Sequence, residues 1–180
     1  EIDLNQAAAI GVAFQTAWFA LTDRAQAKKG ETVLVTGASG SVGLAAVQLA
    51  HTWGCRVLAG LTTPSKAGIA RKAGADLVVD LSSNNPKEEI RSRVLELTNG
   101  DGVDVVIDIV GGEVFSGALR CLKFRGRMVV VGFTSGDIAE MKTNYVLIKN
   151  ISVTGIDRTY YRDYLPEWMD EAQTQIFDYI

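Results

Sequence analysis

Short, continuous apolar runs recur along this chain of 180 residues, and segments with helical periodicity separate them. The run "TVLVT" at residues 32–36 is followed by a stretch in which apolar residues fall at helical spacing, from Val42 to Trp53. Runs such as "VDVVI" and "MVVV" lack polar alternation, which is typical of parallel strands buried on both faces. Parallel strands need long crossover connections, usually helices, so the alternation indicates an α/β fold.

Six strands and their connecting helices follow from this pattern. The expected strands are residues 32–36, 55–60, 76–80, 103–110, 126–133 and 150–155. The expected helices are residues 4–25, 41–53, 64–74, 86–98, 113–122 and 166–180, and residues 144–149 form a short irregular or helical stretch. The first helix is apolar nearly all round, so we expect it to be buried. Right-handed crossovers then predict an α/β fold with a doubly wound parallel six-stranded sheet, the Rossmann arrangement, in strand order 3-2-1-4-5-6.

Composition excludes several classes of function. The net charge is −3, and acidic residues are interspersed among the basic ones, so no basic face for nucleic acid is expected. Cys55, Cys121 and the single histidine, His51, are too few and too widely spaced for a zinc site. Free thiols indicate a reducing compartment, so we expect a cytoplasmic protein, with an organellar location left open. Neither a signal peptide nor a run of ~18 apolar residues appears, so no membrane segment is expected.

The stretch "VLVTGASGSVG" carries three glycines, Gly37, Gly40 and Gly43, in the spacing G-x-x-G-x-x-G. The spacing alone also suits a turn that uses glycine only for its geometry. Its position after the first strand and before the first crossover helix is where a doubly wound fold binds a pyrophosphate. Gly37 would permit the tight turn, Gly40 the approach of a phosphate, and Gly43 close packing of helix on strand. The hydroxyls of Ser39 and Ser41 would be further donors.

The end of the second strand discriminates between the two nicotinamide cofactors. Enzymes that prefer NAD usually place a carboxylate there to hold the ribose 2′-hydroxyl. Leu61 occupies this position, and the hydroxyls of Thr62 and Ser65 and the charge of Lys66 follow it. This favours NADPH over NADH, although a solvated first helical turn is the alternative explanation for Lys66.

Taken together, blocks along the chain resemble the zinc-independent medium-chain dehydrogenase/reductases, and most of all the NADPH:quinone oxidoreductase group. The blocks that carry this resemblance are "AAAIGVAFQTAWFAL", "KKGETVLVTGASGSVGLAAVQLA", "SKAGIARKAGAD", "LTNGDGVDVVIDIVGGEVF", "ALRCLKFRGRMVVVGFTSGDI" and "VLIKNISVTG". They cover essentially the whole chain. The resemblance implies hydride transfer from NADPH to a quinone, or to the activated C=C bond of an enone or enoyl thioester.

The same resemblance implies a set of cofactor contacts. These are Thr16, Gly37, Ser39, Gly40, Ser41, Val42, Gly43, Thr62, Ser65, Lys66, Ile109, Val110, Phe133, Thr134, Ser135 and Ile156. Residues 37–43 would hold the pyrophosphate, residues 62–66 the adenosine 2′-phosphate, and residues 109–110 the adenosine portion and bridging ribose. Residues 133–135 would flank the nicotinamide, together with Thr16 and Ile156.

Two positions depart from the family pattern. Val12 stands where zinc-dependent relatives carry a cysteine ligand, so no catalytic zinc is expected. Leu81 stands where many relatives carry a tyrosine or histidine that packs on the cofactor, so that contact is not expected. Relatives also carry an N-terminal GroES-like domain and return to it after the nucleotide fold, and neither segment is present. Residues 1–180 are therefore expected to be a dinucleotide-binding domain cut from a longer enzyme.

No residue stands out as a general acid. His51 falls within a predicted helix, and Tyr160, Tyr161 and Tyr164 suit a solvated or interface face. The resemblance itself implies that the reaction depends on orientation of the cofactor rather than on an obligatory acid. Catalytic residues therefore stay unassigned.

Three alternatives stay open. An enoyl-reductase module of a polyketide or fatty-acid synthase uses the same fold and motifs, and a non-catalytic NADP-binding protein would share the cofactor site. A short-chain dehydrogenase would show Tyr-x-x-x-Lys; Tyr145 and Lys149 have this spacing, but after the fifth strand instead of on the helix after the fourth. The relatives often dimerise through an edge strand, which makes residues 150–155 a candidate homodimer interface.

Overall fold

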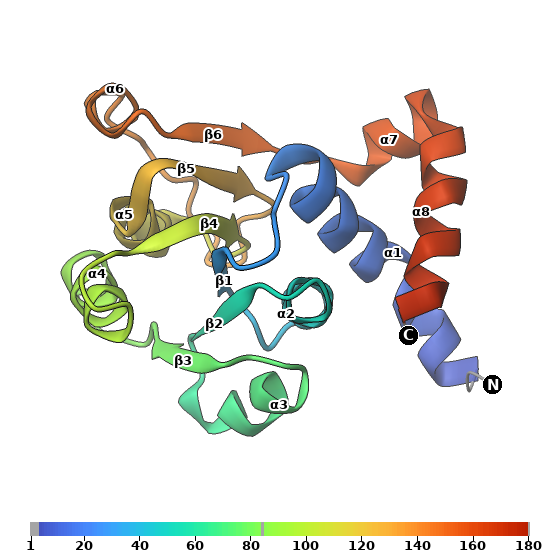
Figure 1. Cartoon of the computed structure of the whole chain (residues 1–180), viewed down its shortest axis with the longest axis horizontal. Helices are drawn as coiled ribbons and strands as arrows, with labels where there is room; N and C mark the ends of the chain where they lie inside the picture. The colour runs from blue at the N-terminus through green and yellow to red at the C-terminus, as the bar shows by residue number, and fades with distance from the viewer. Residues whose placement is uncertain (1–3, 84, 180) are drawn as a thin grey trace.

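The structure is a computed structural model that describes residues 4–83 and 85–179. It contains one six-stranded parallel sheet in the predicted order, β3-β2-β1-β4-β5-β6 (Figure 1). The strands are β1 (Thr32–Thr36), β2 (Arg56–Leu61), β3 (Leu77–Asp80), β4 (Val103–Asp108), β5 (Leu122–Val130) and β6 (Ser152–Gly155). The helices are α1 (Leu4–Phe19), α2 (Ser41–Thr52), α3 (Ala67–Lys72), α4 (Pro86–Leu97), α5 (Gly112–Arg120), α6 (Asn144–Lys149), α7 (Arg158–Tyr164) and α8 (Pro166–Tyr179), with a π-helical turn at Ala20–Arg24 and a 3₁₀ turn at Pro64–Lys66.

Strand side chains alternate between two cores on opposite faces of the sheet. Val33 and Val35 of β1 belong to the core formed with α1, α2 and α8, whereas Leu34 belongs to the core formed with α4 and α5. Figure 1 shows α4 and α5 on one side of the sheet and α1, α2 and α8 on the other. Because both faces are covered, the central strands β1, β2 and β4 carry nearly continuous buried runs, as the sequence indicates.

The strand order reverses at β1, which pairs with β2 on one side and with β4 on the other. In a doubly wound sheet this reversal sends the following helices to opposite faces. Such folds bind ligands in a crevice beyond the carboxyl ends of the strands at this reversal, which here are β1 and β4.

Several elements differ from the prediction. β5 begins at Leu122, earlier than expected, because Leu122 pairs with Val103 across a register shift between Val103 and Val105. The first helix becomes π-helical at Ala20–Arg24, and Val12 on it is 61% exposed, so the expectation of burial is wrong on that face. The helix α7 has no counterpart among the predicted elements. None of the described helices has the length and apolar character needed to cross a membrane.

Aromatic side chains gather where α1, the end of α2 and α8 meet. The rings of Trp18 and Trp53 pack edge to face with centroids 5.0 Å apart, and the Tyr179 ring lies 6.0 Å from Trp18 and 6.1 Å from Trp53. Such pairs add stabilisation beyond the area they bury. They fasten the two terminal helices of the described chain to the layer that covers one face of the sheet.

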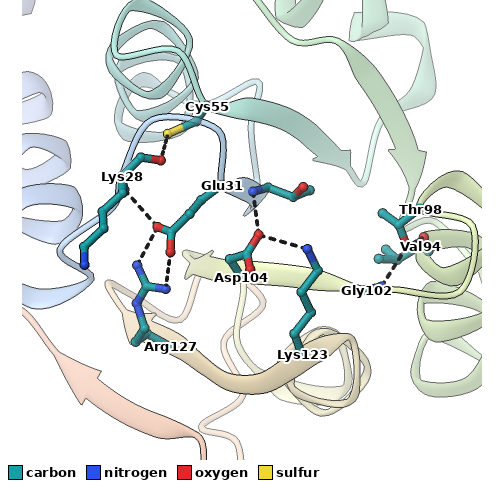
Figure 2. A network of polar contacts seen from close by, with 10 residues as sticks. Lys28, Glu31, Cys55, Val94, Thr98, Gly102, Asp104, Lys123 and Arg127 are labelled. Atoms are coloured by element: carbon teal, nitrogen blue, oxygen red, sulfur yellow. Dashed lines mark hydrogen bonds and ion pairs between the residues drawn. The ribbon is translucent and has the colours of Figure 1, made fainter.

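A polar network ties the strands together at their amino ends, opposite the glycine loop (Figure 2). Glu31 accepts two hydrogen bonds from the Arg127 guanidinium, at 2.7 and 2.8 Å, and one from the Lys28 N–H at 2.8 Å. Asp104 accepts from the Thr32 N–H at 2.8 Å and from Lys123 Nζ at 3.1 Å. These bonds connect β1, β4 and β5.

Glu31→Gln is expected to lower the free energy of unfolding at pH 7 by about 1 kcal/mol, because it weakens a paired, hydrogen-bonded carboxylate. Burial alone would raise the pKa of Glu31, but the bonds from Arg127 and Lys28 outweigh it and hold the pKa below the ordinary 4.5. A lowered pKa stabilises the fold above the ordinary value, and this stabilisation is lost as the pH falls. The difference between the two proteins in urea unfolding should therefore shrink below pH 4.5.

Glu96→Gln is the matched control, because Glu96 pairs with Arg93 on an exposed helix surface. Exposed pairs contribute little, so this change should cost less than about 0.5 kcal/mol. Equal losses for the two variants would contradict a stabilising role for the network.

Candidate functional site

The glycine loop after β1 has the backbone geometry predicted for two of its glycines. Gly37 has φ +67°, and a Cβ there would lie 3.3 Å from Val110 Cγ2. A Cβ on Gly43 would overlap the Gly37 carbonyl oxygen and lie 2.7 Å from Ala38 Cα. Gly37 therefore permits the turn, and Gly43 lets α2 pack directly on the loop backbone.

Gly40, the remaining glycine of the loop, is exposed at the start of α2. A Cβ on Gly40 would meet only the Gly37 carbonyl oxygen, at 3.5 Å. Among the described residues, the N–H groups of Ser41, Val42 and Gly43 have no backbone acceptor. Free N–H groups at a helix N-terminus carry partial positive charge and stabilise an anion.

The glycine loop also carries the two serine hydroxyls that the sequence analysis proposes as further donors. Ser39 is half-buried and Ser41 is exposed, and neither hydroxyl has a hydrogen bond within the described part of the chain. Both are therefore open to a ligand that approaches α2 from solvent.

The end of β2, from which the next loop starts, lies beside the glycine loop, because the Ala38 N–H donates to the Gly60 carbonyl at 3.1 Å. Thr62, Ser65 and Lys66 are all exposed in this loop. The exposed Lys66 ammonium can therefore contact a ligand at the carboxyl ends of the strands, where α2 also begins.

A carboxylate that the sequence analysis missed lies on the neighbouring strand. Asp80 pairs in register with Leu61, so it ends β3 at the level where β2 ends. Its Oδ1 accepts from the N–H of Ser82 at 2.8 Å and from the Ser82 hydroxyl at 2.6 Å. These two bonds hold the pKa of Asp80 below its ordinary value, so the charge near this loop is mixed.

Leu81 is buried against β2. A Cβ on Gly60 would lie 2.8 Å from Leu81 Cδ1, and Leu81 belongs to the core on the α4 and α5 face. Leu81 is thus a packing residue.

The loops after β4 and β5 are bonded to each other. The hydroxyl of Thr134 donates to the Ile109 carbonyl at 3.2 Å, and that of Ser135 donates to the Val110 carbonyl at 2.7 Å. Phe133, in the loop after β5, is exposed. The two hydroxyls predicted to flank a nicotinamide thus also join these loops into one unit.

The two remaining predicted residues lie on the α1 side of the sheet. Thr16 is buried, and its hydroxyl donates to the Val12 carbonyl of its own helix at 2.7 Å. Ile156 packs against the core that contains α1, and its N–H donates to the Val130 carbonyl at 3.0 Å. Neither brings a free polar group to the crevice.

Thr36 and Asp108 are buried polar residues at this edge that the sequence analysis did not select. Neither side chain is exposed, and the Thr36 hydroxyl donates to Asp108 Oδ1 at 2.6 Å. Burial raises the pKa of Asp108, although hydrogen bonds from Thr36 and from peptide N–H groups oppose the shift. The signal in the sequence is an acid within the otherwise apolar run "VDVVIDIV".

Comparison with known proteins assigns the chain to a protein family. A family model described as zinc-binding dehydrogenase matches residues 41–174. The chain belongs to this family. Quinone oxidoreductase-like protein 2 of Bos taurus is 42% identical over 163 residues, which make up 90% of this chain and 46% of that protein. The chain thus spans less than half the length of this relative, and the resemblance to quinone oxidoreductase-like proteins is confirmed.

Solved structures of similar proteins agree with this placement. A mycobacterial protein complexed with NADPH superimposes with a TM-score of 0.87 at 31% identity, over 96% of this chain and 53% of that one. The nucleotide-binding subdomain of the enoylreductase domain of PpsC from Mycobacterium tuberculosis gives 0.81 at 28% identity, over 94% of this chain and 92% of that one.

The family description names zinc, and the donor set of the described residues does not fit it. Among them, no three His, Cys, Asp or Glu side chains come together. Both cysteine thiols are buried and donate to carbonyls, Cys55 to Lys28 at 3.4 Å and Cys121 to Gly117 at 3.3 Å. Burial raises the pKa of Cys55, and that of Cys121 to about 12, so neither thiol ionises readily.

Proposed function

We propose that this chain is the NADPH-binding domain of a zinc-independent oxidoreductase that transfers hydride to a quinone or to an activated C=C bond. The observation that carries the proposal is the set of N–H groups of Ser41, Val42 and Gly43, which have no backbone acceptor among the described residues and follow the exposed Gly40 at the strand-order reversal. This is the combination of charge and access that a pyrophosphate needs. The likeness to a protein solved with NADPH supports the choice of ligand.

In this proposal the chain binds and orients the cofactor, and bound NADPH supplies the hydride. The start of α2 holds the pyrophosphate, and the exposed hydroxyls and charge of residues 62–66 hold the 2′-phosphate. The loop at residues 109–110 lies beside the adenosine portion and the bridging ribose, and residues 133–135, which are bonded to it, flank the nicotinamide. We assign no proton donor within the described residues.

Titration of the 180-residue chain with NADPH and NADH, followed by cofactor fluorescence, tests the proposal. NADPH should bind more tightly. Equal affinities would contradict the assignment of the 2′-phosphate site, and failure to bind either cofactor would contradict the proposed function. NADPH oxidation with quinones and enones by the full-length protein tests turnover; binding without oxidation would indicate a non-catalytic NADP-binding protein.

An enoyl-reductase domain of a polyketide synthase is the second candidate. It is favoured by the match that spans 92% of the PpsC nucleotide-binding subdomain. Acyl-carrier or ketosynthase sequence in the reading frame that encodes this chain would decide for it. A frame that encodes a stand-alone enzyme would decide against it.

We also propose a homodimer formed through β6, in a cytoplasmic protein. β6 lies at the edge of the sheet, with one side unpaired in the described part of the chain, and Leu147 and Ile148 beside it are 78% and 72% exposed. Two free cysteines fit a reducing compartment. Sedimentation velocity should give twice the mass of the chain, and a monomer at micromolar concentration would contradict the interface.

A further inference from the structure

The ends of β1 and β4 share a buried hydrogen-bond network made by two side chains. The Thr36 hydroxyl donates to Asp108 Oδ1 at 2.6 Å and accepts from the N–H groups of Ile109 at 3.0 Å and Val110 at 3.4 Å. Asp108 Oδ2 accepts from the Gly111 N–H at 3.2 Å. A hydroxyl has one proton and two lone pairs, so Thr36 uses its full capacity. The N–H groups of the three residues after β4 are thus all bonded to Thr36 or Asp108.

The carbonyls of the same segment are bonded to the loop after β5. The carbonyls of Ile109 and Val110 accept from the N–H groups of Thr134 and Ser135, each at 3.0 Å. Because their N–H groups and their carbonyls are both bonded, these peptides have a fixed orientation. The loop after β5 in turn takes its position from them.

We propose that Thr36 and Asp108 are positioning residues for the cofactor: they fix the peptides of residues 109–111, and through them residues 134–135, so that the crevice is formed before NADPH binds. This inference rests on the proposed function. Both side chains are fully buried, so they act through the backbone and do not touch the ligand. A wall that is already ordered saves the cost of ordering it on binding, which raises affinity.

Thr36→Val tests this role, because it keeps the shape of the side chain and removes the hydroxyl. The substitution removes all three hydrogen bonds of the hydroxyl, and the loss of even one buried hydrogen bond corresponds to roughly a tenfold change in an equilibrium. We therefore expect the Kd for NADPH to rise about tenfold at a temperature where the variant is fully folded. Amide hydrogen exchange at Ile109 and Val110 should accelerate, whereas Thr36→Ser should restore both properties.

Asp104→Asn is the matched control. Asp104 lies on β4, as Asp108 does, and it also accepts a hydrogen bond from a peptide N–H, that of Thr32 (Figure 2). It lies at the amino end of the strand, whereas Asp108 lies at the carboxyl end. This change should lower stability and leave the Kd for NADPH unchanged. If Thr36→Val does not fold, Asp108→Asn replaces it, because it keeps an acceptor for the Thr36 hydroxyl and loses the one that faces Gly111.

Three results would overturn the proposal: unchanged exchange at Ile109 and Val110 in Thr36→Val, an unchanged Kd despite faster exchange, or an equal rise of the Kd in Asp104→Asn. Failure of the unsubstituted chain to bind NADPH would refute the proposed function and the cofactor role together. Faster exchange in Thr36→Val would even then show that the network orders the loop, so the two failures are distinguishable.

Discussion

Gly43→Ala is expected to unfold this domain or bring it close to unfolding, whereas Gly40→Ala should leave it folded and weaken its hold on NADPH. A methyl group on Gly43 overlaps the Gly37 carbonyl oxygen and lies 2.7 Å from Ala38 Cα. Both obstacles are backbone atoms, so α2 has to move away from β1 to make room. We expect a loss of about 3–5 kcal/mol in the free energy of unfolding, measured with urea.

Gly40 differs because its backbone suits any residue. Its φ is −83° and its ψ is 170°, and a methyl group there would meet only the Gly37 carbonyl oxygen, at 3.5 Å. The methyl group would occupy the space through which we propose a phosphate reaches the free N–H groups of α2. We expect nearly unchanged stability and an affinity for NADPH lowered about tenfold or more, since one charge-assisted bond accounts for that much.

Gly11→Ala provides the control for both substitutions. Gly11 lies within α1 with nothing within 4 Å of the added methyl group, so the change should stabilise the helix by roughly 0.5–1 kcal/mol. A normal urea midpoint for Gly43→Ala would contradict the packing of α2 on the loop. A normal affinity for Gly40→Ala would contradict the position assigned to the phosphate.

Lys66→Glu is expected to abolish the preference for NADPH by lowering its affinity about 10- to 100-fold, with little effect on NADH. The estimate follows from replacing a charge-assisted hydrogen bond to a phosphate with a repulsion. Because Lys66 is exposed, the preference of the unsubstituted chain should also weaken as salt is added. Asp80 ends the neighbouring strand at the level of Leu61, so we expect its negative charge to reduce the preference for NADPH.

Lys72→Glu makes the same change in net charge on the exposed surface of α3 and serves as the control. It should leave the ratio of the NADPH and NADH affinities unchanged. If the two variants lose NADPH affinity equally, the effect comes from overall charge, and the assignment of the 2′-phosphate to Lys66 is wrong.

Most of the fold could be predicted from the sequence because both faces of the sheet are covered. Runs such as "VDVVI" have no polar alternation, and that pattern indicates parallel strands whatever the details of packing. The early start of β5 could not be predicted in this way. It depends on the pairing of Leu122 with Val103 across a register shift, which is a contact between strands and leaves no trace in periodicity.

The candidate site divides in the same manner. Gly37 and Gly43 could be assigned their geometry in advance because their places follow from the order of strand and helix. Thr36 and Asp108 could not, since their role arises only when β1 and β4 lie side by side. Asp80 was missed for a similar reason, because its level relative to Leu61 is set by the register of β3.

The tryptophan fluorescence of this domain reports on only one side of the sheet. Trp18, Trp53 and Trp168, the three tryptophans of the chain, all belong to α1, the end of α2 and α8, and none lies on the face covered by α4 and α5. Tryptophan emission therefore follows the loosening of one layer, while far-ultraviolet circular dichroism follows helices of both. Coincident urea curves from the two signals would establish cooperative melting of the two layers. Curves that separate would reveal which layer comes apart first in each glycine or glutamate variant.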